Sequence, residues 1–170
     1  TPVRLLGKGG DGAVFKVDER CALKVAFLGH ENTLRNEFNV AERLPDDERL
    51  LKPIRCLMLT EEEAKILRSA HNKNEDDEEV EGEGEELKLS QLALEVPLFS
   101  GQDLLDEILQ QSKGRRGEIF STESALTLFH EIALGVKALH DAGFCHLDLS
   151  PENILVKRII AASGKTEWKI

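Results

Sequence analysis

A short run of glycines near the start constrains this chain more than any other feature of its sequence. Gly7, Gly9 and Gly12 form a Gly-x-Gly-x-x-Gly pattern between two apolar segments, residues 3–8 and 12–18. The second segment alternates in polarity, which is the period of a strand, so the third glycine opens a strand and not a helix. A glycine loop between antiparallel strands lets backbone N–H groups approach phosphates; an ordinary Gly-rich hairpin turn is the alternative.

The rest of the chain is predicted to continue with strands and one helix, and then to become mainly helical. Side chains at helical spacing end at Pro45, and the pair Ser100-x-x-Asp103 is typical of a capping box. A long helix before Gly143 carries an apolar stripe of Ala125, Phe129, Ile132, Val136 and Leu139. The predicted strands are 3–8, 12–18, 20–27, 54–60, 87–96, 154–157 and 166–170; the predicted helices are 31–44, one from about 104, and 121–142, with exposed turns at 111–118 and around 163–164.

The net charge of −10 arises from one segment. Residues 75–86 hold nine acids and no base, and the remaining 23 acids nearly balance the 22 bases. We expect this stretch to be a solvated loop, although it could recruit a basic partner or substrate. The balanced remainder predicts neither nucleic-acid binding nor a basic membrane surface.

Length and cysteine content narrow the class further. A chain of 170 residues suits one domain or a large part of one, and no apolar run is long enough to cross a membrane. Its three cysteines are far apart in the sequence, with no spacing typical of zinc sites or a disulfide framework. We therefore expect an intracellular, cytoplasmic protein.

Two charged residues in the first part of the chain are candidates for a nucleotide site. Lys24 lies in an apolar strand, where it must reach solvent or an anion. Glu37 lies beside the buried stripe of the following helix and is a possible partner. The alternatives are an exposed lysine on a strand edge and a solvated flank of the helix.

A polar loop at 146–153 supplies a second group. Asp148 and Asn153 are five residues apart, after the long helix. A carboxylate can accept a hydroxyl proton while a carboxamide oxygen binds Mg²⁺, a combination that suits phosphoryl transfer. An Asp/Asn-rich turn around Pro151 is the alternative.

Together these segments resemble the eukaryotic protein kinases. The resemblance covers nearly the whole chain, and its motifs fall in the family's order. It rests on Gly7-Lys-Gly9-Gly-Asp-Gly12-Ala-Val14 for the glycine-rich loop, Cys21-Ala22-Leu23-Lys24 for the third-strand lysine, Glu37 to Leu44 for the helix, and His146-Leu-Asp148-Leu-Ser-Pro-Glu-Asn153 for the catalytic loop.

The resemblance implies an α+β, bilobal fold. Residues 1–96 would form an N-lobe with a five-stranded antiparallel sheet and one C-helix, carrying an acidic insertion at about 71–86. Residues 97–170 would form the hinge and the first part of a helical C-lobe, with the catalytic loop at 146–153. Residues 166–170 resemble the strand before the Asp-Phe-Gly motif. We therefore expect an incomplete domain from a longer protein that does not transfer phosphate by itself and leaves apolar surface of the 121–142 helix uncovered.

The resemblance also implies a reaction and its residues. Mg-ATP would donate its γ-phosphoryl group to a serine or threonine hydroxyl of a protein substrate. Asp148 would orient the hydroxyl, Asn153 would bind Mg²⁺, and Glu37 would hold Lys24 toward the phosphates. The nucleotide would meet Leu6, Gly7, Lys8, Gly9, Gly12, Val14, Ala22 and Lys24, with Leu94 as gatekeeper and the Glu95 carbonyl on the adenine amino group.

Four positions depart from the family's pattern. Leu147 and Ser150 replace the usual arginine and lysine of the catalytic loop, Asp11 puts an acid in the phosphate loop, and Pro97 lacks the usual N–H donor of the hinge. These departures leave two alternatives to an active protein kinase. One is a pseudokinase that acts as a binding scaffold, and the other is a small-molecule kinase of related fold.

Overall fold

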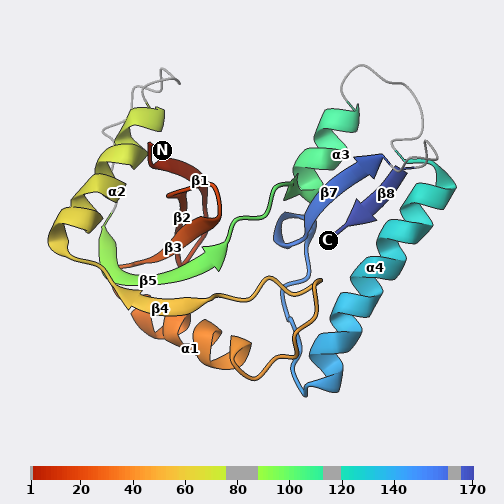
Figure 1. The fold of residues 1–170 in the computed structure, drawn as a ribbon, viewed down its shortest axis with the longest axis horizontal. Coiled ribbons are helices and arrows are strands. Elements are labelled where there is room, and N and C mark those ends of the chain that lie inside the picture. The colour runs from red at the N-terminus through yellow and green to blue at the C-terminus, as the bar shows by residue number, and fades with distance from the viewer. Residues whose placement is uncertain (1, 76–87, 113–119, 161–165) are drawn as a thin grey trace. The chain divides into compact units, whose positions relative to one another are not determined.

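The chain forms two compact units. The computed structural model describes residues 2–75, 88–112, 120–160 and 166–170 (Figure 1). One unit comprises Thr1–Arg43 and Leu51–Leu98, and the other comprises Leu44–Leu50 and Phe99–Ile170. The sequence placed the division after residue 96 and counted residues 44–50 with the first part, whereas these residues group with the second unit.

The first unit is built on one antiparallel sheet. Its strand order is β1-β2-β3-β5-β4, and every neighbouring pair is antiparallel. This confirms the predicted five-stranded sheet. The strands are β1 (Arg4–Lys8), β2 (Gly12–Lys16), β3 (Cys21–Phe27), β4 (Arg55–Met58) and β5 (Leu89–Pro97).

Two helices, α1 (Glu31–Ala41) and α2 (Glu61–Glu75), cover opposite faces of this sheet (Figure 1). Side chains alternate between the faces of a strand, so neighbours in β3 contact different helices. Val25 packs in the cluster that includes Leu67 of α2, and Ala26 packs in the cluster that includes Leu34 of α1. The predicted 31–44 helix ends three residues early.

Helix α2 was not predicted, and the strand predicted to reach residue 60 ends at Met58. Thr60 and Glu63 begin the helix as a capping box: the Thr60 N–H donates to Glu63 Oε2 at 2.7 Å, and the Glu63 N–H donates to Thr60 Oγ1 at 3.2 Å. The hydrogen bond from the Thr60 backbone lowers the pKa of Glu63. The Thr-x-x-Glu signal was present in the sequence, but no element was predicted for residues 61–70.

The second unit combines three helical elements with a small sheet in the order β6-β7-β8. Leu104, Leu128, Val156 and Trp168 form its buried core, and the Phe120 and Trp168 rings meet edge to face at 5.3 Å. Its elements are β6 (Gln102–Asp103), α3 (Leu104–Ser112), α4 (Thr122–Asp141), the 3₁₀ turn η1 (Pro151–Asn153), β7 (Leu155–Ile160) and β8 (Thr166–Lys169).

Two local predictions in this unit were wrong. Asp103 caps α3, since its Oδ1 accepts from the Asp106 N–H at 2.8 Å; Ser100 instead accepts from Lys157 Nζ at 2.8 Å. The packed stripe of α4 includes Leu128 and Gly135, whereas the predicted stripe member Phe129 is 69% exposed. Uncovered apolar surface was expected on this helix, and Phe129 provides it.

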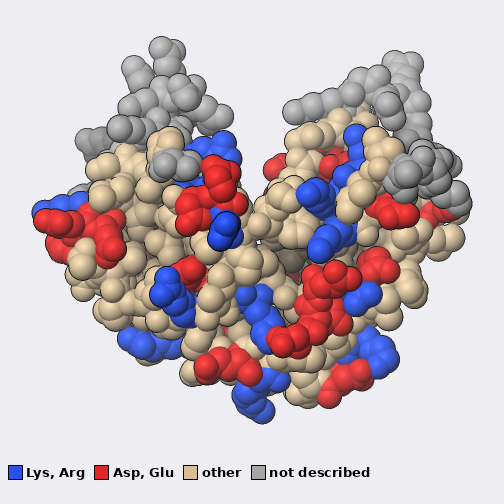
Figure 2. Space-filling model, viewed as in Figure 1, with Lys and Arg blue, Asp and Glu red and all other residues tan. Residues whose placement is uncertain are grey.

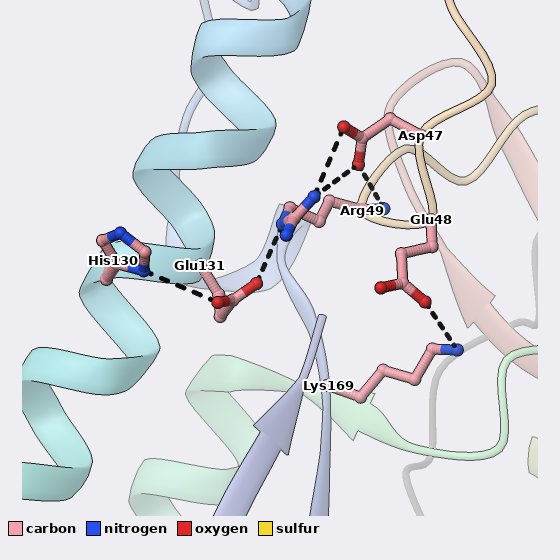
Figure 3. A network of polar contacts seen from close by, with 6 residues as sticks. All are labelled: Asp47, Glu48, Arg49, His130, Glu131 and Lys169. Carbon is pink, nitrogen blue, oxygen red and sulfur yellow. Dashed lines mark hydrogen bonds and ion pairs between the residues drawn. The ribbon is translucent and has the colours of Figure 1, made fainter.

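A polar network joins residues 44–50 to α4 and β8 (Figure 3). Arg49 donates from Nε to Glu131 Oε2 at 2.8 Å and from Nη1 to Asp47 Oδ1 at 3.1 Å. A Cβ on Gly135 would lie 3.3 Å from Arg49 Cβ, so the helix passes this segment at close range. The backbone N–H and guanidinium of Arg49 lower the pKa of Asp47. These contacts explain why residues 44–50 belong to the second unit.

Some predictions fall wholly or partly outside the described residues. These are the acidic segment beyond Glu75, most of the turn at 111–118, and the turn around 163–164. Of the acidic insertion predicted at about 71–86, residues 71–75 are the last residues of α2.

No helix in the described ranges is both long and apolar enough to cross a membrane. On the face seen in Figure 2, basic and acidic side chains are interspersed among the described residues.

Candidate active site

Three predicted site residues lie side by side on the sheet of the first unit. Val14 of β2 pairs with Lys24 of β3, and Lys24 pairs with Leu94 of β5. Paired residues of antiparallel strands share a face, so these side chains form a row across three strands. Ala22 lies on the same face, two residues before Lys24. The strand register therefore brings four of the predicted residues to one surface.

Helix α1 supplies the partner of the lysine in that row. Glu37 Oε2 lies 2.5 Å from Lys24 Nζ, and both side chains are partly exposed, at 39% and 32%. The expected contact between these residues is therefore present. Leu34, one helical turn earlier, is fully buried and anchors this stretch of the helix on the sheet.

The glycine loop is a tight hairpin between β1 and β2. Its turn is closed by the Gly9 N–H, which donates to the Gly12 carbonyl at 2.9 Å. A Cβ on Gly12 would come within 2.3 Å of the Val25 carbonyl oxygen, whereas a Cβ on Gly7 or Gly10 would meet no atom within 4 Å. The pairing of β2 with β3 therefore requires a glycine at position 12, whereas a side chain would fit at positions 7 and 10.

The other residues predicted to contact the nucleotide differ in how exposed they are. Leu6 is 43% exposed and, with Gly7, helps to line a shallow hollow of about 410 Å³ on β1. Lys8 is exposed, and its Nζ lies 6.0 Å from the centroid of the Phe27 ring. Leu94 is fully buried in the cluster under α1, so it forms part of the wall behind this surface.

Glu95 joins three strands at the end of β5. Its Oε2 accepts from Arg55 Nε at 2.6 Å and its Oε1 from the Cys21 thiol at 3.4 Å. Burial, with this carboxylate beside it, raises the pKa of Cys21. The Glu95 backbone carbonyl accepts from the Ile54 N–H at 2.7 Å.

The second unit holds the predicted catalytic loop. Asn153 Nδ2 donates to both the carboxylate and the backbone carbonyl of Asp148, each at 2.9 Å. Because the amide nitrogen is the donor, the Asn153 oxygen remains the atom suited to a cation, and its hard-donor chemistry fits Mg²⁺. The turn η1 places Asn153 back toward Asp148.

Leu147 gives this loop an unusual backbone. Its φ is +64°, and its side chain is 95% exposed. Within the described residues it is the one non-glycine with positive φ, a conformation that is strained for leucine and is often found at functional sites. This strained residue lies between His146 and Asp148 of the predicted catalytic loop.

One contact near the glycine loop was not foreseen. His30 Nδ1 lies 2.6 Å from Asp11 Oδ1, which joins the turn between β1 and β2 to the residue before α1. A histidine just before a helix has no distinctive sequence signal, and its partner is nineteen residues away.

Comparisons with known proteins agree on the kind of fold. No family model matches the chain. The sporulation protein kinase mde3 of Schizosaccharomyces pombe is 40% identical over 63 residues, and a calcium and calcium/calmodulin-dependent serine/threonine-protein kinase, DMI-3, of Medicago truncatula is 42% identical over 62 residues. Each match covers 36% of this chain and 11% of the relative.

A solved structure matches over a larger share of the chain. The PknI kinase domain of Mycobacterium tuberculosis superposes with a TM-score of 0.58 over 97% of this chain and 55% of that one, at 17% identity. The chain therefore forms a protein-kinase-like domain. Its similarity in sequence to protein kinases covers about a third of its length.

Proposed function

We propose that this domain binds Mg-ATP and transfers the γ-phosphoryl group to a serine or threonine hydroxyl of a protein. The observation that carries the proposal is the Lys24–Glu37 ion pair beside the row Val14–Lys24–Leu94. An ammonium held by a carboxylate on an otherwise apolar strand is positioned to meet an anion.

The first unit would bind the nucleotide. Backbone N–H groups of the glycine loop, at Gly7, Lys8, Gly9 and Gly12, would approach the phosphates, and Lys24 would add a positive charge. Leu6, Val14 and Ala22 would contact the base, with Leu94 behind them. The Glu95 carbonyl would accept a hydrogen bond from the adenine amino group.

The second unit would act on the acceptor. Asp148 would accept the proton of the attacking hydroxyl and orient it, and its hydrogen bonds from Asn153 would fix the carboxylate. Bound at the Asn153 oxygen, Mg²⁺ would neutralise charge on the transferring phosphoryl group. Catalysis would come mainly from positioning and charge stabilisation.

A nucleotide-binding scaffold without transfer activity is the second candidate. Leu147 and Ser150 favour it, since neither brings the positive charge that the family has at these positions. An intracellular, cytoplasmic setting is part of both proposals and agrees with the three free cysteines. A basic partner for the acidic segment remains a prediction.

Phosphate transfer by the product of the complete gene separates the two candidates. Transfer from Mg-ATP to a general protein substrate should fall about a thousandfold in Asp148→Asn and in Lys24→Met. Two controls keep the same chemical changes away from the site: Asp141→Asn and Lys137→Met remove an exposed ion pair on α4 and should leave transfer unchanged. Equal transfer by all variants would refute the site, and nucleotide binding without transfer would support the scaffold.

A further inference from the structure

The turn of the glycine loop is tied to the start of α1 by three hydrogen bonds. The Phe27 N–H donates to the Asp11 carbonyl at 2.9 Å, and the His30 N–H donates to the Phe27 carbonyl at 2.9 Å. The side chains complete the connection through His30 Nδ1 and Asp11 Oδ1, 2.6 Å apart. An ionised carboxylate only accepts hydrogen bonds, so Nδ1 carries the hydrogen.

This contact determines where the only acid of the glycine loop lies. A carboxylate at the tip of a phosphate-binding loop would repel an anionic nucleotide. Here the Asp11 carboxylate is held by the side chain of His30, the residue directly before α1. The acid that the sequence analysis gave as a departure from the family's phosphate loop is thus paired with the histidine that precedes α1.

We propose that His30 is a positioning residue for nucleotide binding, which acts by holding the Asp11 carboxylate away from the phosphates. The inference rests on the proposed function, since it assumes that the loop receives the triphosphate. His30 itself touches no reacting atom. Its absence would release Asp11 toward the loop, where both side chains are about half exposed and free of tight packing.

The same contact links the loop to the ion pair of the site. His30 directly precedes α1, and α1 carries Glu37, which holds Lys24. The loop tip and the lysine are therefore both in contact with one short helical segment, at its N-cap residue and in its second turn. Loss of His30 should weaken nucleotide affinity without a change in the chemistry of transfer.

The test is a double-mutant cycle read as Mg-ATP affinity by calorimetry. His30→Ala should weaken binding about fivefold, and His30→Asn, whose Nδ2 can replace Nδ1 as donor, should restore most of the loss. In the background of Asp11→Gly, His30→Ala should have no further effect, because no carboxylate remains to be released. In the complete gene product, His30→Ala should raise KM for Mg-ATP and leave kcat within about twofold.

Several results would overturn the inference. Wild-type affinity in His30→Ala would show that His30 does not act through Asp11. An effect of His30→Ala that persists in full in the Asp11→Gly background would show the same. A melting curve accompanies each variant. If His30→Ala unfolds, the Mg-ATP affinity of His30→Asn is compared with and without Asp11→Gly, and a loss of affinity in His30→Asn that persists in full with Asp11→Gly present overturns the inference. If wild type and Lys24→Met both fail to bind Mg-ATP, the proposed function itself is refuted.

Discussion

The two units hold their predicted site residues in different ways. In the first, Val14, Lys24 and Leu94 are neighbours through the register of three paired strands. In the second, Asp148 and Asn153 lie on an exposed loop held by two hydrogen bonds from one amide. A ladder fixes many residues at once, whereas the loop depends on a few contacts and a strained leucine.

This difference indicates how each unit should respond to change. A substitution in the sheet of the first unit should affect the folding of that unit before it affects chemistry. A substitution in the loop of the second unit should affect chemistry with little loss of stability, because the side chains of the loop are exposed. The predictions below test this contrast, from the largest expected effect to the smallest.

Asp148→Asn should give the largest effect on activity and almost none on stability. We expect kcat of the complete gene product to fall about a thousandfold, which corresponds to about 4 kcal/mol, since the general base is lost. The midpoint of urea unfolding should stay within the error of wild type. A large loss of stability in this variant would show that the loop is structural, against the contrast drawn here.

Gly12→Ala should give the largest loss of stability in the first unit. The added Cβ would lie 2.3 Å from the Val25 carbonyl oxygen, so β2 and β3 must separate. We expect a loss of about 2 kcal/mol in the free energy of unfolding. The control is Gly10→Ala in the same turn, where the Cβ meets open space and stability should change by less than about 0.5 kcal/mol. Equal effects of the two substitutions would contradict the structure of the hairpin.

Arg49 and Glu131 should be coupled in the stability of the second unit. Their side chains are about a quarter exposed and are joined at 2.8 Å. A double-mutant cycle with Arg49→Ala and Glu131→Ala should give a coupling of about 1 kcal/mol by urea unfolding. Additive effects would show that residues 44–50 are not held to α4 by this pair.

Asp47 should give the smallest effect, visible as a dependence of stability on pH. Its pKa is lowered in the folded state by the backbone N–H and guanidinium of Arg49. The stabilisation is therefore fully present above the ordinary pKa of about 3.9 and is lost as the pH falls through the lower folded value. Asp47→Asn should flatten this acid limb in unfolding measurements between pH 5 and pH 2. An unchanged slope would exclude a contribution from Asp47.

The sheet and the site residues on it were accessible from sequence because they depend on local patterns. Alternating polarity placed β2, an apolar run placed β3, and the resemblance to protein kinases put Glu37 in the ion-pair position for Lys24. The predicted Lys24–Glu37 contact is present in the structure. Helix α2 was missed although Thr60-x-x-Glu63 signals its start in the sequence.

Other features depend on contacts between residues that are far apart in the chain. The partner of Arg49 lies 82 residues away, so no local pattern could assign residues 44–50 to the second unit. The predicted stripe of α4 differs from the buried face of the helix, because apolar side chains such as Phe129 occur on more than one face. Only packing selects which of these faces is buried. The contact between His30 and Asp11 likewise could not be predicted from a local pattern, because the two residues are nineteen positions apart.

Paramagnetic broadening by Mn-ATP tests the proposed function most directly, namely that the nucleotide and its metal ion bind at the predicted residues. With Mn²⁺ in place of Mg²⁺, the amide resonances of Gly9, Gly12 and Lys24 and the side-chain amide of Asn153 should broaden together at one equivalent. Lys24→Met should reduce the broadening at all four positions. Broadening in one unit alone, or none in either unit, would contradict the account.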